Sequence, residues 1–191
     1  MTRKADFDID PLFLERWSPR AMSGQPVAEA DLRRLFEAAR WAPSSGNSQP
    51  WRFVYARAGT SDFDRFFGLL AQGNRPWCAR AGALILLAAR TVNDQGKPMP
   101  SASFDTGAAW MALALQGTKM GLVVHAMGGF DAERSKVEVG LPPEVVPCCM
   151  IAVGQPGSVE DLPEPYRSRE QPNDRKPQAT FVSEGKYTTG S

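Results

Sequence analysis

The apolar residues between positions 28 and 42 repeat with the period of an α-helix. The apolar positions are Leu32, Leu35, Phe36 and Ala39, and charged residues occupy most of the positions between them. One apolar face and one charged face are typical of a helix that packs on a core. Because Pro43 disfavours helical backbone at Ala42, the helix should end there. The spacing therefore predicts a helix over 28–42.

Five further segments carry helical patterns. They span residues 8–16, 62–72, 74–81, 102–120 and 131–140. The segment 102–120 is the longest and is apolar almost all round, which is typical of a helix in the middle of a core, including one shared with a partner chain. Gly121 is expected to end it. Asn74 and Asp131 are the first residues of the two short segments, 74–81 and 131–140, and each is expected to be the N-cap of its helix.

Four segments are predicted to be β-strands: residues 51–58, 83–89, 122–127 and 147–154. The run at 83–89 is apolar at every position, which favours a buried central strand. A loop containing glycine and proline is predicted between residues 91 and 101.

Residues 155–191 differ from the rest of the chain because they are rich in proline and charge and poor in apolar residues. Such a tail is either disordered or an arm that lies on another surface. Four residues favour the arm: Tyr166, Phe181, Val182 and Tyr187. Because neither a repeat nor a second core is evident, we predict a single domain over residues 1–191, with 155–191 as its extended arm.

Composition narrows the possible partners. The chain has 191 residues, of which 42% are hydrophobic, and 22 basic residues nearly balance 21 acidic ones. A net charge of +1 gives no reason to expect nucleic acid or an anionic membrane as partner. The first ten residues are not expected to be a signal peptide, and the run at 81–89 is too short to span a bilayer. Three cysteines without framework spacing suit a reducing, cytoplasmic location.

The sequence lacks the residues that several common types of metal site and active site require. The single histidine, His125, makes a His-rich metal site impossible, and no C-x-x-C pattern supports a zinc site, so no metal is expected. His125 lies in an apolar run and is interpreted as a satisfied core residue rather than a base. Cys148 and Cys149 are adjacent in a predicted strand and are interpreted as core packing. Neither G-x-S-x-G, a P-loop nor G-x-G-x-x-G is present.

Four short stretches could bind a ligand. In "RWSPR", Arg16 and Arg20 flank Ser18 and could clamp a phosphate, or the stretch is a solvated basic turn. The loop "APSSGNSQPW" offers hydroxyls and amides that suit a heterocycle such as a flavin, or that bond their own backbone. "AMGGFD" allows close approach of a ligand to Gly128 and Gly129, or is a simple turn. "NDRKP" could complete an anion site through Arg175, or only solubilise the tail.

The order of these stretches is more specific than any one of them. R-x-S-x-R comes first, followed by A-P-S-S-x-N-x-Q-P-W after an amphipathic helix, a Gly-Gly turn before a short helix, a strand closing on "VGQP", and R-x-P in the tail. This order resembles that of the nitroreductase family of FMN-dependent oxidoreductases. The resemblance extends over about residues 9–182.

The resemblance implies an α+β fold with a mainly antiparallel central sheet flanked by helices. It also implies an intertwined homodimer in which the C-terminal arm, residues 155–191, is exchanged between subunits. FMN would lie at the dimer interface, with NADH or NADPH as electron donor.

The resemblance also implies site residues. Arg16, Trp17, Ser18, Arg20 and Arg175 would hold the phosphate, ribityl and pyrimidine end, with Arg20 near flavin N1 and O2. The polar loop of the other subunit would contribute Pro43, Ser44, Ser45, Asn47 and Gln49. Asn74, Met127, Gly128 and Gly129 would line the ring, with the Gly128 N–H near flavin N5.

The implied activity is hydride transfer from NAD(P)H through flavin N5 to a nitroaromatic, quinone or similar electron-poor acceptor, by a ping-pong mechanism that demands no acid or base side chain. Two alternatives stay open. One is a specialised pathway flavoenzyme of the same fold, an oxidase or dehydrogenase, and the other is a flavin-binding dimer without turnover. Trp17 and Pro19 depart from the family's usual bend, and the short loop 90–101 departs from larger members that roof the pocket with extra helices.

Overall fold

The structure is a computed structural model, and it describes residues 3–188. Within these residues one antiparallel sheet has the strand order β1-β2-β4-β3. Its strands are β1 (Trp51–Arg57), β2 (Ala83–Arg90), β3 (Val123–Met127) and β4 (Val145–Gly154). β2 is central and buried along nearly its whole length, as its unbroken apolar run predicts.

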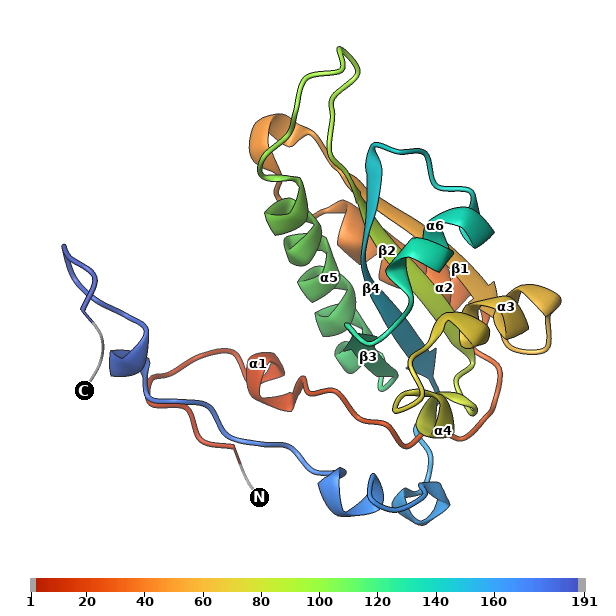
Figure 1. The fold of residues 1–191 in the computed structure, drawn as a ribbon. Helices are drawn as coiled ribbons and strands as arrows, with labels where there is room; N and C mark the ends of the chain where they lie inside the picture. The colour runs from red at the N-terminus through yellow and green to blue at the C-terminus, as the bar shows by residue number, and fades with distance from the viewer. Residues whose placement is uncertain (1–2, 189–191) are drawn as a thin grey trace.

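Helices cover both faces of the sheet (Figure 1). They are α1 (Leu12–Glu15), α2 (Glu29–Arg40), α3 (Ser61–Leu69), α4 (Arg75–Cys78), α5 (Ala102–Lys119) and α6 (Ala132–Val139). The alternation of side chains along β2 divides the core in two. Ile85 and Leu87 pack with α2 and α5, whereas Leu84 and Leu86 pack with α3 and α4. The α+β class with a mainly antiparallel sheet is therefore confirmed.

Helix termini follow the predicted caps with one exception. Asp131 caps α6, because its side chain accepts the backbone N–H of Arg134 at 2.9 Å. Gly121 follows the last turn of α5 with φ +71°, where glycine is favoured. The prediction that Asn74 caps α4 is wrong. The backbone of Asn74 is itself helical, and its side chain bonds elsewhere.

Two other expectations are corrected. The helix predicted over 8–16 is a single turn, Leu12–Glu15, because the chain becomes extended at Arg16 before Pro19. Core packing of both adjacent cysteines is also wrong. Cys149 is partly buried against the core, but Cys148 is exposed, near a β-bulge where the register between β2 and β4 shifts at Leu87 and Ala88.

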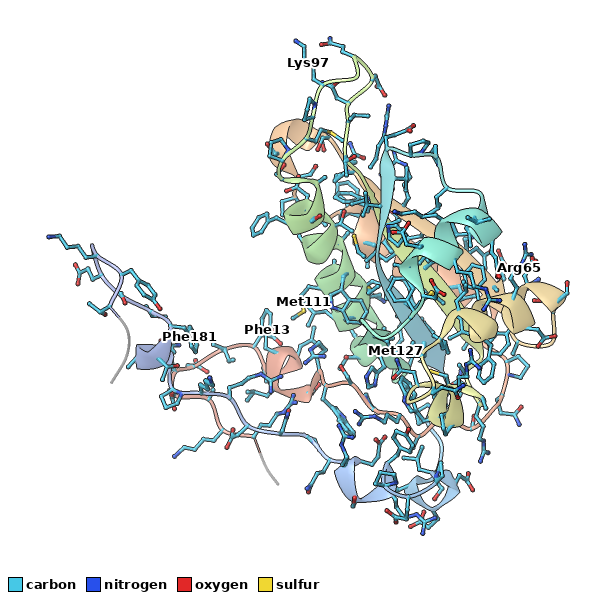
Figure 2. All side chains as sticks on the ribbon, viewed as in Figure 1. Phe13, Arg65, Lys97, Met111, Met127 and Phe181 are labelled. Carbon is cyan, nitrogen blue, oxygen red and sulfur yellow. The ribbon has the colours of Figure 1, made fainter. Side chains whose placement is uncertain are left out.

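The segment after β4 leaves the sheet and runs beside the N-terminal residues (Figure 1). Arg3 donates to the Asn173 carbonyl at 3.0 Å and so joins the two segments. Figure 2 shows Phe13 and Phe181 on this extended part of the molecule. Between residues 3 and 188, no helix is both long and apolar enough to cross a membrane.

Candidate functional site

A cavity of about 450 Å³ lies between the bend after α1, β3 and the C-terminal segment. We call it the arginine cavity. It is lined by predicted site residues, namely Arg16, Trp17, Ser18, Arg20 and Arg175, together with Arg3, Arg169 and His125. Residues from both ends of the sequence therefore meet at one place, and it stays a prediction that the bend and the tail bind one ligand together.

The charges around this cavity are unbalanced. Within residues 3–188, no carboxylate lies within ion-pair distance of Arg3, Arg16, Arg169 or Arg175. Burial, and then the positive charges of Arg3 and Arg175, lower the pKa of Arg16. A guanidinium nevertheless stays protonated in proteins, so these groups repel one another. An anion in the cavity would relieve that repulsion.

The N-terminal segment helps to hold the cations in place. Arg3 donates through Nη1 to the carbonyl oxygens of Leu14 and Arg16, at 3.0 and 2.7 Å. Burial and the nearby Arg175 lower the pKa of Arg3. Nothing in the local sequence around Arg3 distinguishes it from a solvated terminal residue, so its place at the cavity could not be predicted from the sequence.

His125 forms part of the cavity wall. Its Nδ1 lies 2.8 Å from the Pro19 carbonyl oxygen, and its ring packs on Trp77 with 4.5 Å between ring centroids. Burial is the main cause that lowers its pKa to about 4, so the ring is neutral near pH 7. His125 is thus hydrogen-bonded, as predicted, but the prediction that it lies in the core is wrong, because it is only partly buried and lines the cavity.

The turn after β3 presents backbone donors. Gly128 and Gly129 are exposed, and no hydrogen-bond acceptor for either N–H occurs within residues 3–188. Asn74 donates through Nδ2 to the Gly129 carbonyl at 2.8 Å. A side chain at Gly129 would meet that amide, which explains glycine there by close approach. Met127 is only 4% exposed and lies beside Cys78, so one chain by itself does not present Met127 to a ligand, and its implied contact with the ring stays a prediction.

The polar loop between α2 and β1 is partly self-bonded. Ser44 Oγ accepts the N–H of Gln49 at 3.0 Å, and the Gln49 amide donates to the carbonyl and side-chain oxygens of Asn47. Gly46, Asn47 and Gln49 have positive φ angles, which are uncommon for the latter two. Pro43 and Ser45 are exposed, as is Asn47. The two hypotheses about this loop are therefore compatible: it bonds to itself, and it still exposes polar groups that could contact a ligand.

Asp105 anchors this loop to the start of α5. The Asp105 carboxylate is buried and accepts the N–H of Ser45 at 3.1 Å and the hydroxyl of Ser101 at 3.0 Å. Asp105 is a single acidic residue inside an apolar helix, so its contact with the polar loop could not be predicted from the sequence.

One chain does not bring the polar loop and the arginine cavity together. Ser45 lies at the first turn of α5, whereas Trp17 and Pro19 lie beside Thr118 and Gly121 at its other end. An α-helix of 18 residues is about 27 Å long. The loop of a second chain could complete the site, and this stays a prediction. Within the described part of the chain, no cluster of three or more histidine, cysteine or acidic side chains could hold a metal ion.

Known proteins are similar to this chain in fold and in sequence. The model of the nitroreductase family matches residues 14–72 and 58–155. A solved structure described as an oxidoreductase containing FMN is 38% identical and superimposes with a TM-score of 0.94, over 97% of this chain and 96% of that one.

Two curated relatives are also similar. An uncharacterized 15.4 kDa protein of Mycolicibacterium smegmatis is 34% identical over 63% of this chain and 80% of its own length. A Streptomyces coelicolor protein named "Putative NADH dehydrogenase/NAD(P)H nitroreductase" is 36% identical over 40% of this chain. That match spans 38% of the Streptomyces protein. The antiparallel sheet with helices on both faces defines the class, and the family match over most of the chain shows that it belongs to the nitroreductase family.

Proposed function

We propose that this chain is an FMN-dependent oxidoreductase that takes electrons from NADH or NADPH and reduces a small electron-poor acceptor such as a nitroaromatic or a quinone. The observation that carries the proposal is the set of guanidiniums without carboxylate partners around one cavity, within residues 3–188. The likeness to an FMN-containing oxidoreductase over nearly the whole chain supports FMN as the ligand.

The residues present fit a flavin mononucleotide at its phosphate end. A phosphate is a dianion with several acceptor oxygens, and arginines bind such groups by charge-assisted hydrogen bonds. Arg16, Ser18 and Arg175 would hold the phosphate and ribityl chain, with Arg3 and Arg169 adding positive charge. Burial, and then the positive charges of Arg3 and Arg175, lower the pKa of Arg16, and a bound anion would relieve the repulsion among these charges.

The residues present also fit the flavin ring. The exposed N–H groups of Gly128 and Gly129 and the amide of Asn74 are donors of the kind that a flavin edge accepts. Arg20 would lie near N1 and O2, where a cation stabilises negative charge on the reduced ring. The polar loop of the partner chain would cover the ring through Pro43, Ser44, Ser45, Asn47 and Gln49.

Bound FMN supplies a site that takes a hydride from NADH or NADPH and passes electrons to an acceptor. The protein binds and orients the reactants. The transfer of a hydride needs no general base, and the pKa of His125, lowered to about 4 mainly by burial, makes its ring a weak one. The proposed order is ping-pong, with the nicotinamide leaving before the acceptor enters the same space.

We further propose that the active form is a homodimer of single-domain subunits in which the C-terminal arm of each chain, residues 155–191, lies against its own chain at Glu170 and contacts the other chain with its far end. Phe181 and Tyr187 on the arm, and Phe104 on α5, have exposed fractions of 65%, 85% and 83%. Apolar side chains this exposed favour a protein partner. The free thiols of Cys78, Cys148 and Cys149 support a cytoplasmic location, where thiols stay reduced.

The test is a spectroscopic titration of purified protein with FMN, followed by anaerobic addition of NADH or NADPH. We expect tight uptake of FMN, bleaching of its visible absorbance by the nicotinamide, and reoxidation by a quinone or nitroaromatic. A protein that takes up no FMN would contradict the proposal entirely. Uptake without bleaching by either nicotinamide would leave a specialised flavoenzyme or a flavin-binding dimer.

A further inference from the structure

The peptide unit that joins Pro19 to Arg20 is held at both of its polar atoms by side chains distant in sequence. Its carbonyl oxygen lies 2.8 Å from Nδ1 of His125 in β3. Its N–H donates to Oε1 of Glu170 at 2.6 Å, from the C-terminal segment. A carbonyl can only accept, so Nδ1 of His125 carries the proton, which agrees with a neutral ring.

Glu170 does more than accept one hydrogen bond. The same Oε1 also accepts the N–H of Ala21 at 2.8 Å. The Glu170 side chain is only 2% exposed, and Oε2 has no hydrogen-bond partner within residues 3–188. Oε2 lies 3.8 Å from Nη1 of Arg20, so its charge faces the guanidinium. Burying a carboxylate without a full set of hydrogen-bond partners costs folding free energy. We therefore expect Glu170 to have a specific role at this place.

Trp77 completes the arrangement from α4. The His125 ring packs on it, and the Arg20 guanidinium lies 5.9 Å from the centroid of the Trp77 ring. Both ends of the Arg20 residue are therefore fixed, the backbone by His125 and Glu170 and the guanidinium by Trp77 and Glu170. Arg20 and His125 both line the arginine cavity.

We propose that His125 and Glu170 are positioning residues that clamp the Pro19–Arg20 peptide and thereby aim the Arg20 guanidinium at the cofactor. This inference rests on the proposed flavin function. Glu170 also attenuates the positive charge of Arg20, so the C-terminal arm sets both the place and the strength of the cation at the reduced flavin. The arm thus belongs to the electron-transfer site as well as to the proposed dimer.

Matched substitutions at each position separate the hydrogen bond from other effects. His125→Asn keeps an amide close to the place of Nδ1, whereas His125→Gln moves it to the place of Nε2. Glu170→Gln keeps an acceptor for the two N–H groups but removes the charge, whereas Glu170→Ala removes both. Asp161→Asn is the control, because it breaks another contact of the same segment, the ion pair with Arg80 at 2.7 Å.

The measurements are the FMN dissociation constant and the midpoint potential of bound FMN, with thermal unfolding as a check on folding. We expect His125→Asn and Glu170→Gln to bind FMN within about threefold of wild type, and His125→Gln and Glu170→Ala to bind about tenfold more weakly. Glu170→Gln should raise the midpoint potential, because Arg20 keeps its place and loses its counter-charge. Glu170→Ala removes the same charge but also releases Arg20, so its midpoint potential should lie below that of Glu170→Gln. Asp161→Asn should change neither quantity.

The double variant His125→Gln with Glu170→Ala tests the clamp directly. Because both side chains hold one peptide, we expect a loss close to that of either single variant rather than the product of the two. Multiplying losses would overturn the clamp, as would equal potentials for Glu170→Gln and Glu170→Ala. If the alanine variant does not fold, the FMN affinities of His125→Asn and His125→Gln decide, and equal affinities for the two would overturn the clamp. Wild-type protein that binds no FMN would instead contradict the proposed function.

Discussion

At the scale of single residues, Arg16 is expected to contribute directly to FMN binding. Its side chain is partly buried beside Arg3 and Arg175 and has no carboxylate within ion-pair distance in residues 3–188. Arg16→Ala should weaken FMN binding by about 1.5–3 kcal/mol, as for the loss of a charge-assisted hydrogen bond. Fluorescence titration with FMN measures this. Arg33→Ala, on the exposed face of α2 where the side chain is 68% exposed, is the matched control. Equal affinities for both variants would make Arg16 a solvated turn residue.

The lowered pKa of His125 predicts that the stability of the fold depends on pH. Its pKa is lowered to about 4 in the fold, against 6.5 in the unfolded chain. Between these values the unfolded chain binds a proton that the folded chain does not, so stability is lost as the pH falls from 6.5 to 4. The loss should be at most about 3 kcal/mol. Urea unfolding across this range, compared with His125→Asn, isolates the contribution. Parallel pH profiles for the two proteins would contradict it.

At the scale of elements, the packing of α5 on β3 depends on one glycine. A Cβ at Gly117 would overlap the Val124 side chain in β3, so Gly117→Ala should destabilise the fold by about 1–3 kcal/mol despite the better helix propensity of alanine. Thermal and urea unfolding measure the change.

Gly107 in the same helix is the control, because a Cβ there meets no atom of its own chain. Gly107→Ala should stabilise the protein by up to about 1 kcal/mol. Destabilisation by Gly107→Ala would mean that this face of α5 packs against a second copy. If Gly117→Ala were as stable as the wild type, β3 would be able to shift and make room for the added methyl group, which would contradict the prediction.

At the scale of the whole molecule, the C-terminal segment is expected to hold two chains together. Deletion of residues 160–191 should shift the protein from dimer towards monomer in sedimentation velocity, because the exposed apolar side chains of the arm are lost. Phe181→Ser combined with Val182→Ser should act in the same direction but less strongly, and it retains Glu170 and Arg175. Full-length protein that sediments as a monomer would refute the arm-exchanged dimer.

Local patterns were sufficient for much of the fold. The central strand β2 followed from its apolar run, α2 from its amphipathic spacing and Pro43, and the cap of α6 from Asp131. These features depend on periodicity and on caps that act within a few residues. The order of short motifs further indicated the family and the α+β class.

The sequence by itself therefore determined most of the elements, the family and five of the eleven residues that line the arginine cavity. Only the tertiary structure decided that Asn74 bonds Gly129 instead of capping α4, and that Arg3 joins the cavity. It alone joined Glu170 to Arg20, which are 150 residues apart. The physical reason is that such contacts depend on how the sheet and the terminal segments are placed in space, which no local periodicity encodes.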